Sequence, residues 1–114
     1  MDVLIPDQWK RDVASILHSG DATRIIMREA ARLAWQAAFP SAWTHDLYDA
    51  IERALSDANI KGRQIVDMAE SGETYAFWFQ YESRQLYGKI CLTPARDKII
   101  MYSAHPPRKG EEKL

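Results

Sequence analysis

The hydrophobic pattern of the chain changes its period near residue 60, and this change constrains the fold more than any other feature of the sequence. Before that point, apolar residues recur at helical spacing in three segments, 6–20, 21–39 and 44–59. Beyond it, three segments alternate as β-strands do: ETYAFWFQYE, QLYGKICLT and KIIMYSAH. We therefore expect an α+β fold, with N-terminal helices packed on one face of a C-terminal antiparallel β-sheet of at least three strands.

Signals at the ends of these segments support the division. Gly20 is placed to stop the first helix, Pro40 to close the second and Thr44 to open the third. Short turns at Ser83-Arg84 and at 94–97 connect the three strands into a meander. The segment IKGRQIVDM (60–68) is compatible with a short strand and with a helix-to-sheet link. The 114 residues suit a single domain, 1–114, with a helical part (1–59) and a sheet part (60–114).

The composition, 46% hydrophobic and 27% charged, is ordinary for a globular protein. No apolar run approaches the roughly 18 residues that span a bilayer, and the N-terminus lacks a signal-peptide core. We therefore expect no membrane anchoring in this chain and a cytoplasmic site of action, reached directly or by delivery as the C-terminal part of a larger effector. The lone Cys91 excludes an internal disulfide and a Cys-based zinc site, and common metal and nucleotide motifs are missing. We expect neither a metal nor a cofactor.

Charge is distributed unevenly along a chain whose formal net charge is −1. Residues 1–83 carry 8 Lys/Arg and 13 Asp/Glu, whereas residues 84–114 carry 7 Lys/Arg and 3 Asp/Glu. Such asymmetry suggests an anionic partner for the basic part, although a solvated terminal segment would show the same excess.

Alternation also predicts which side chains of the sheet face away from the helices. We expect Phe77 and Phe79 to face the helices, and in the last strand we take Ile100, Tyr102 and Ala104 as core. The side chains then expected on the opposite face are Trp78, Gln80, Tyr87, Lys89, Cys91, Thr93, Ile99, Met101, Ser103 and His105. The last strand is the least determined, because a slip of one residue would turn His105 into the core.

The polar members of this set fit RNA cleavage without a metal ion, in which the ribose 2′-hydroxyl attacks the adjacent phosphate. The reaction needs an acid or base that titrates near neutral pH, a role that suits His105. It also needs fixed cations near the phosphoryl oxygens, here Lys89 and Arg84. Ser103 would orient the imidazole or donate to a phosphate oxygen.

Substrate binding would use the aromatic and basic residues nearby. Tyr87 or Trp78 would stack on an unpaired base, and Arg108 and Lys109 would add contacts to phosphate. Each assignment has a structural alternative: the two aromatic rings can pair across strands as packing, the two cations can form a solvated tail, and a strand-end His105 can be structural.

The chain from about residue 60 onward, with its ETYAFWFQYE, LYGKICL and KIIMYSAHPPRKG segments, resembles the small bacterial RNase toxins of the barnase–EndoU–colicin–RelE (BECR) superfamily. The likeness rests on helices before a compact sheet, a Lys on a strand and Ser-x-His at a strand end. It implies that His105, Lys89, Ser103 and Arg84 are the functional set. It also implies an RNA substrate and a cognate immunity protein or antitoxin that neutralises the activity.

The acidic helical half departs from the usual basic RNase toxin. It favours action on a particular structured RNA, such as tRNA, over indiscriminate cleavage. The alternative hypothesis is a non-enzymatic macromolecule-binding protein, such as a small phage-type inhibitor or an antitoxin-like module, because aromatic residues suit an interface as well as a core.

Overall fold

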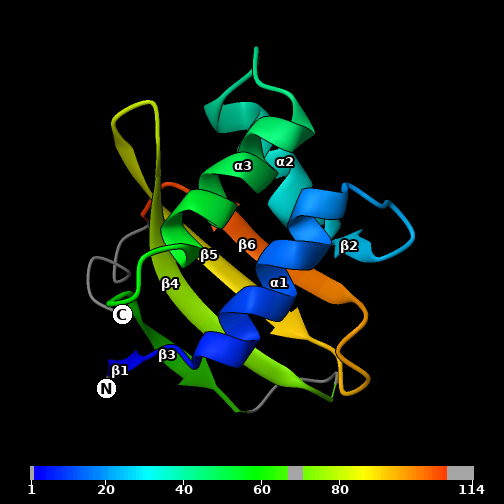
Figure 1. Ribbon diagram of the computed structural model, residues 1–114. Coiled ribbons are helices and arrows are strands. Elements are labelled where there is room, and N and C mark those ends of the chain that lie inside the picture. Colours follow the sequence, from blue (N-terminus) through cyan, green and yellow to red (C-terminus); the bar gives the residue numbers. More distant parts are fainter. Residues whose placement is uncertain (1, 67–70, 108–114) are drawn as a thin grey trace.

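The computed structural model describes residues 2–66 and 71–107, which form helices packed on one face of a mostly antiparallel sheet (Figure 1). This confirms the predicted α+β fold. In chain order, the elements are β1 (Val3–Leu4), α1 (Asp7–Ser19), β2 (Ile25–Met27), α2 (Glu29–Ala38), α3 (Thr44–Leu55), β3 (Lys61–Ile65), β4 (Glu73–Tyr81), β5 (Arg84–Leu92) and β6 (Ile99–His105).

The strands of the described residues are arranged in the order β1-β3-β4-β5-β6-β2. The central four form an antiparallel meander, β1 adds antiparallel to β3, and β2 adds parallel to β6. The sheet therefore has more strands than the minimum of three that we expected. The first 59 residues supply both outer strands, so the helical part also contributes to the sheet. The undecided segment 60–68 forms β3, and its last two residues lie outside the described ranges.

The predicted second helix, 21–39, is wrong over residues 21–28. Ile25–Met27 pairs in parallel with Ile99–Met101, and α2 begins only at Glu29. The side chain of Asp21 accepts the backbone N–H of Thr23 at 2.9 Å, a local turn that competes with a helical start. The β-branched pair Ile25-Ile26 then suits the sheet edge better than a helix. The third helix is also shorter than 44–59, since it ends at Leu55.

The boundaries predicted at Gly20 and Thr44 are confirmed, and α2 ends at Ala38, two residues before Pro40. Gly20 ends α1 in the left-handed conformation, with φ of 63°, and α3 begins at Thr44. Within the described chain, no helix is long and apolar enough to cross a membrane.

The helices cover a single face of the sheet: α2 packs on β6, α3 on β4, and α1 on α3 and β5 (Figure 1). Trp9 of α1 is fully buried at the centre of this layer, with its ring 5.1 Å from that of Tyr75 and 6.3 Å from that of Phe77. Its indole Nε1–H donates to the backbone oxygen of Glu73 at 2.9 Å. Trp9 therefore fixes α1 against β4 by packing and by a directed bond.

Arg96, in the β5–β6 turn, connects that turn to α1 and β4. Its guanidinium donates to Asp12 Oδ2 at 2.7 Å and to Glu73 Oε1 at 2.6 Å. The hydrogen bond from Arg96 is the main reason that the pKa of the Asp12 carboxyl lies below its ordinary value.

The β4–β5 hairpin closes through a two-residue turn in which Glu82 and Ser83 have φ of 50° and 64°. Positive φ at both positions is the signature of a type I′ turn, which normally carries Asn or Gly. Neither Glu nor Ser adopts this region without strain.

We expect Trp9→Ala to lower the free energy of unfolding by about 3–5 kcal/mol, because it leaves a large cavity and removes the bond to Glu73. Urea denaturation followed by circular dichroism measures the loss. The matched control is Trp43→Ala, since Trp43 is 72% exposed. Equal losses in the two variants would contradict the central position of Trp9.

We expect Arg96→Gln to destabilise the protein at neutral pH and to lose this effect in acid. Asp12 has a lower pKa in the folded protein than its unfolded value of about 3.9. Its contribution is therefore present above about pH 4 and disappears as the pH falls through the folded pKa. Urea denaturation from pH 7 to pH 2 should show the gap between variant and wild type closing, whereas the exposed control Lys98→Gln should show no such trend.

Replacing the strained turn residues should stabilise the hairpin. The double variant Glu82→Asn, Ser83→Gly is expected to raise the free energy of unfolding by about 1 kcal/mol. Ser83→Val, a β-branched residue at the same positive φ, should lower it. If thermal or urea denaturation gave the two variants the same stability, the turn would not be strained as described.

Candidate functional site

One row of side chains crosses four strands on the face of the sheet that points away from the helices, which we call the open face. Residues directly opposite each other in an antiparallel ladder share a face. Phe77 faces the helices, so its neighbour Ala76 faces outward, and Ala76 pairs with Arg63 on one side and Lys89 on the other. Lys89 in turn pairs with Ser103 of β6. This cationic row is Arg63, Ala76, Lys89 and Ser103.

The neighbouring row is aromatic and ends on the imidazole. Trp78 pairs with Tyr87, which pairs with His105. The rings of Trp78 and Tyr87 are edge-to-face with centroids 5.7 Å apart, whereas Tyr87 and His105 are stacked at 5.4 Å. The two rows lie side by side, so His105 is next to Ser103 and Lys89 on one surface.

A β-bulge in β6 places His105 there. Met101 pairs with Ile90 and Ser103 pairs with Lys89, so Tyr102 is the extra residue of the bulge. The expected outward direction of Ile99 and Met101 is therefore wrong, because both are in the helix-covered core. Ile100, expected in the core, pairs with Cys91 on the open face, but Ser103 and His105 are on the expected side.

His105 is only 3% exposed. Its Nδ1 lies 2.7 Å from the backbone oxygen of Pro106. A carbonyl oxygen only accepts, so Nδ1 carries a proton, and in the neutral imidazole the lone pair is on Nε2. The ring is thus held in one tautomer by its own backbone and in one plane by Tyr87.

The structure does not bring Arg84 to this surface. Arg84 begins β5 on the helix side, where its guanidinium lies 5.0 Å from the ring centre of Phe39 and donates to the backbone oxygen of Ala38 at 3.4 Å. It cannot stabilise a phosphate beside His105 from there. Arg108 and Lys109 lie outside the described residues.

Two cations of the open face were not found from the sequence. Arg63 belongs to the cationic row, and Lys61, two residues before it, has the same orientation by alternation. Gly62 between them faces the helices, where an added Cβ would collide with the backbone oxygen of Ala76 and approach Ile5. Alternation around Gly62 predicts the shared direction of Lys61 and Arg63 if 60–68 is a strand. The sequence leaves the assignment of this segment open, so these two cations were not identified from it.

The open face is cationic across its described strands. Lys61, Arg63 and Lys89 point outward, and no Asp or Glu of β3 to β6 does, because Glu73 pairs with the core residue Leu92 and bonds to Arg96 on the helix side. Within residues 2–66 and 71–107, none of the three cations makes a hydrogen bond or an ion pair. Positive charge without counter-charge favours an anionic ligand.

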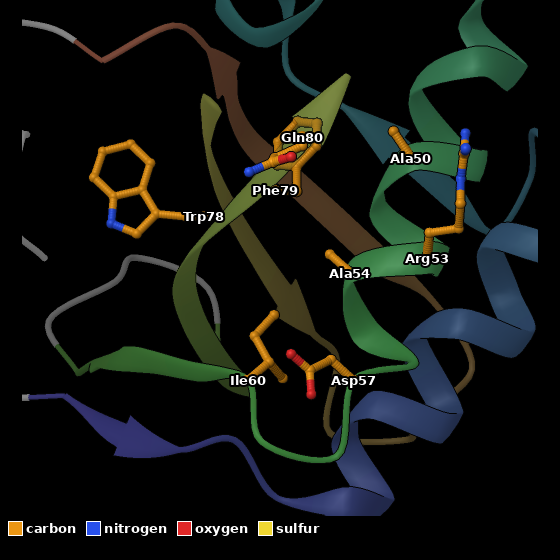
Figure 2. Close-up of a pocket in the computed structure, with 8 residues that line it drawn as sticks. All are labelled: Ala50, Arg53, Ala54, Asp57, Ile60, Trp78, Phe79 and Gln80. Atoms are coloured by element: carbon orange, nitrogen blue, oxygen red, sulfur yellow. The ribbon is translucent and has the colours of Figure 1, made fainter. Parts of the chain in front are cut away.

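A pocket of about 380 Å³ lies between β4 and α3 (Figure 2). Ala50, Ala54, Ile60 and other residues line it, and Arg53 and Asp57 give it charges of opposite sign. Figure 2 shows the indole of Trp78 extending from β4 away from α3. Trp78 and Gln80 also line the pocket, so it borders the open face at β4, but its charges of opposite sign do not favour an anion.

Among the described residues, no group of three His, Cys, Asp or Glu side chains could hold a metal ion. Comparison with known proteins gives no family model, no curated protein and no solved structure that matches this chain.

Proposed function

We propose that the protein is a metal-independent ribonuclease toxin of the BECR type that cleaves RNA, such as tRNA, on its open face. The observation that supports this most is the adjacency of two cross-strand pairs, Lys89–Ser103 and Tyr87–His105. They bring an imidazole, a cation and a hydroxyl together on a surface whose described strands carry no carboxylate.

Each group has a role in attack by the ribose 2′-hydroxyl. Nε2 of His105 takes the hydroxyl proton as the 2′ oxygen bonds to phosphorus. The bond from phosphorus to the 5′ oxygen breaks, and that oxygen takes a proton from water. Lys89 stabilises the charge that develops on the phosphoryl oxygens, and Ser103 donates to one of them. The products are a 2′,3′-cyclic phosphate and a free 5′-hydroxyl.

Aromatic side chains would hold the base next to the scissile phosphate. Trp78 and Tyr87 are both partly exposed on this face, so either ring can stack on an unpaired base. His105 is nearly buried, so RNA binding must move the groups that cover its imidazole. An immunity protein or antitoxin with acidic side chains would neutralise the toxin by covering the same cations.

The low exposure of His105 favours a second candidate, a non-enzymatic protein that binds a macromolecule through the open face. In that case the imidazole is a structural member of the aromatic row, and Lys89 contributes to affinity alone.

The decisive assay is incubation of the purified protein with a labelled single-stranded oligoribonucleotide, with and without EDTA. We expect cleavage in both, and none of the all-2′-deoxy analogue. His105→Gln and Lys89→Gln should each lower the rate about 10²–10⁴-fold. The matched controls are His45→Gln, an exposed residue of α3, and Arg11→Gln of α1, which should cleave as the wild type does.

Other outcomes reject the proposal. Cleavage that disappears with EDTA would exclude the metal-independent mechanism, and unchanged activity of both His105→Gln and Lys89→Gln would exclude the assigned residues. Binding of intact RNA by wild type would support the second candidate. Urea denaturation of each variant separates a lost role from a lost fold, and Lys89→Gln covers the case in which the buried His105 tolerates no replacement.

A further inference from the structure

Arg63 differs from every other arginine of the described chain. Each of the others makes a hydrogen bond, an ion pair or a ring contact, for example Arg24 with the backbone oxygen of Asp97 and Arg32 with Glu29. Arg63 makes none within residues 2–66 and 71–107, although it lies in the middle of a strand. Its guanidinium is exposed and offers five N–H donors, a geometry that suits bidentate binding of phosphate.

Building on the proposed function, we infer that the RNA strand crosses the β-strands, from His105 on β6 to Arg63 on β3, and that Arg63 binds a phosphate several nucleotides from the bond that is cleaved. Arg63 and Lys89 are in the same row with only Ala76 between them. Ala76 is small and uncharged, so no opposing charge separates the two cations within the row, and the partly exposed Trp78 lies two residues further along β4 on the same face.

The rest of the open face confines the strand to this course. The next row on the side of Ala76 away from Trp78 contains Thr74, Cys91 and Ile100, which pair with one another in sequence across β4, β5 and β6. All three are buried, and they offer no cation. Among the described residues of this face, phosphates therefore have favourable partners along the cationic row and at Lys61, which lies beyond Trp78 on β3.

Strand spacing sets the length of RNA that is required. Neighbouring strands are about 4.8 Å apart, so roughly 10 Å separates the backbone positions of Lys89 and Arg63. A stacked nucleotide advances about 3.4 Å along its strand, so about three nucleotides bridge the two cations. Arg63 should thus contribute to long substrates and not to the shortest ones.

The test uses oligoribonucleotides with one cleavable ribose, all other riboses being 2′-deoxy, extended by one to five nucleotides on either side. For the wild type, kcat/KM should rise with length on one side and level off at about three to four nucleotides. Arg63→Gln should lose about ten-fold or more on the long substrates and cleave the shortest one as the wild type does. Arg11→Gln, on the helical layer, should match the wild type throughout.

Affinity provides a second readout that does not need cleavage. For a single strand, each phosphate contact contributes about 0.7 to the slope of log K against log salt. Arg63→Gln should lower that slope by about this amount on a five-nucleotide extension, and Arg11→Gln should leave it unchanged.

The two hypotheses fail in different ways. No cleavage by wild type rejects the ribonuclease, while a reduced salt slope for Arg63→Gln would still support the course of the strand. Cleavage with an equal loss on short and long substrates, or an unchanged salt slope, overturns the inference about Arg63. Displacement of RNA by poly-glutamate at equal charge would also overturn it, because the face would then bind acidic polypeptide without regard to nucleotides.

Discussion

The burial of one face of the sheet under the helices is the constraint on which the other features depend. Tyr75, Phe77 and Phe79 must face inward to pack with Trp9 and the helices, so the alternate residues of β4 must face outward. The pairing of β4 with β3 and β5 then determines which residues of those two strands face outward. The outward positions of Arg63 and Lys89 are therefore consequences of core packing, and a core substitution that shifted the register would also dismantle the open face.

β6 has two requirements that a regular strand cannot meet together. Ile99 and Met101 fill the core, and strict alternation from them would turn Ser103 and His105 inward as well. The extra residue at Tyr102 changes the phase between these pairs. The apolar half of β6 thus stabilises the fold while its polar end belongs to the open face, and the guanidinium of Arg28 lies over the Tyr102 ring at 5.6 Å from its centre.

Sequence patterns correctly predicted the side-chain directions of the long, regular strands. The alternation of β4 and β5 placed Trp78, Tyr87 and Lys89 correctly, because nine-residue strands with one buried face repeat their signal several times. β2 spans three residues and pairs in parallel with a strand far along the chain, so nothing local distinguished it from the helix that follows. Such a contact depends on tertiary packing, which overrides a short helical pattern.

The direction of β6 could not be read in the same way. A bulge is one irregular residue, and the sequence of a strand with apolar residues on both sides does not mark where it occurs. The predicted alternation is continuous along β6, whereas the bulge interrupts it. The predicted directions of Ser103 and His105 therefore agree with the structure, and those of Ile99 to Met101 do not. The position of Arg84, in contrast, follows from the alternation of β5, because the pattern that turns Lys89 outward turns Arg84 to the helix side, where it pairs with Tyr81.

The position of β6 between β5 and β2 also has a consequence for the order of folding. The meander β3 to β6 closes through neighbouring turns, whereas the β2–β6 ladder joins residues 25–27 to residues 99–101 across most of the chain. Closing a loop of that length is entropically unfavourable until other contacts support it, so we expect this ladder among the last to form. His105 and Ser103 pair with β5 across a short turn, so they do not depend on this ladder. A folding intermediate that lacks β2 would therefore already carry the imidazole and the bulge that directs it.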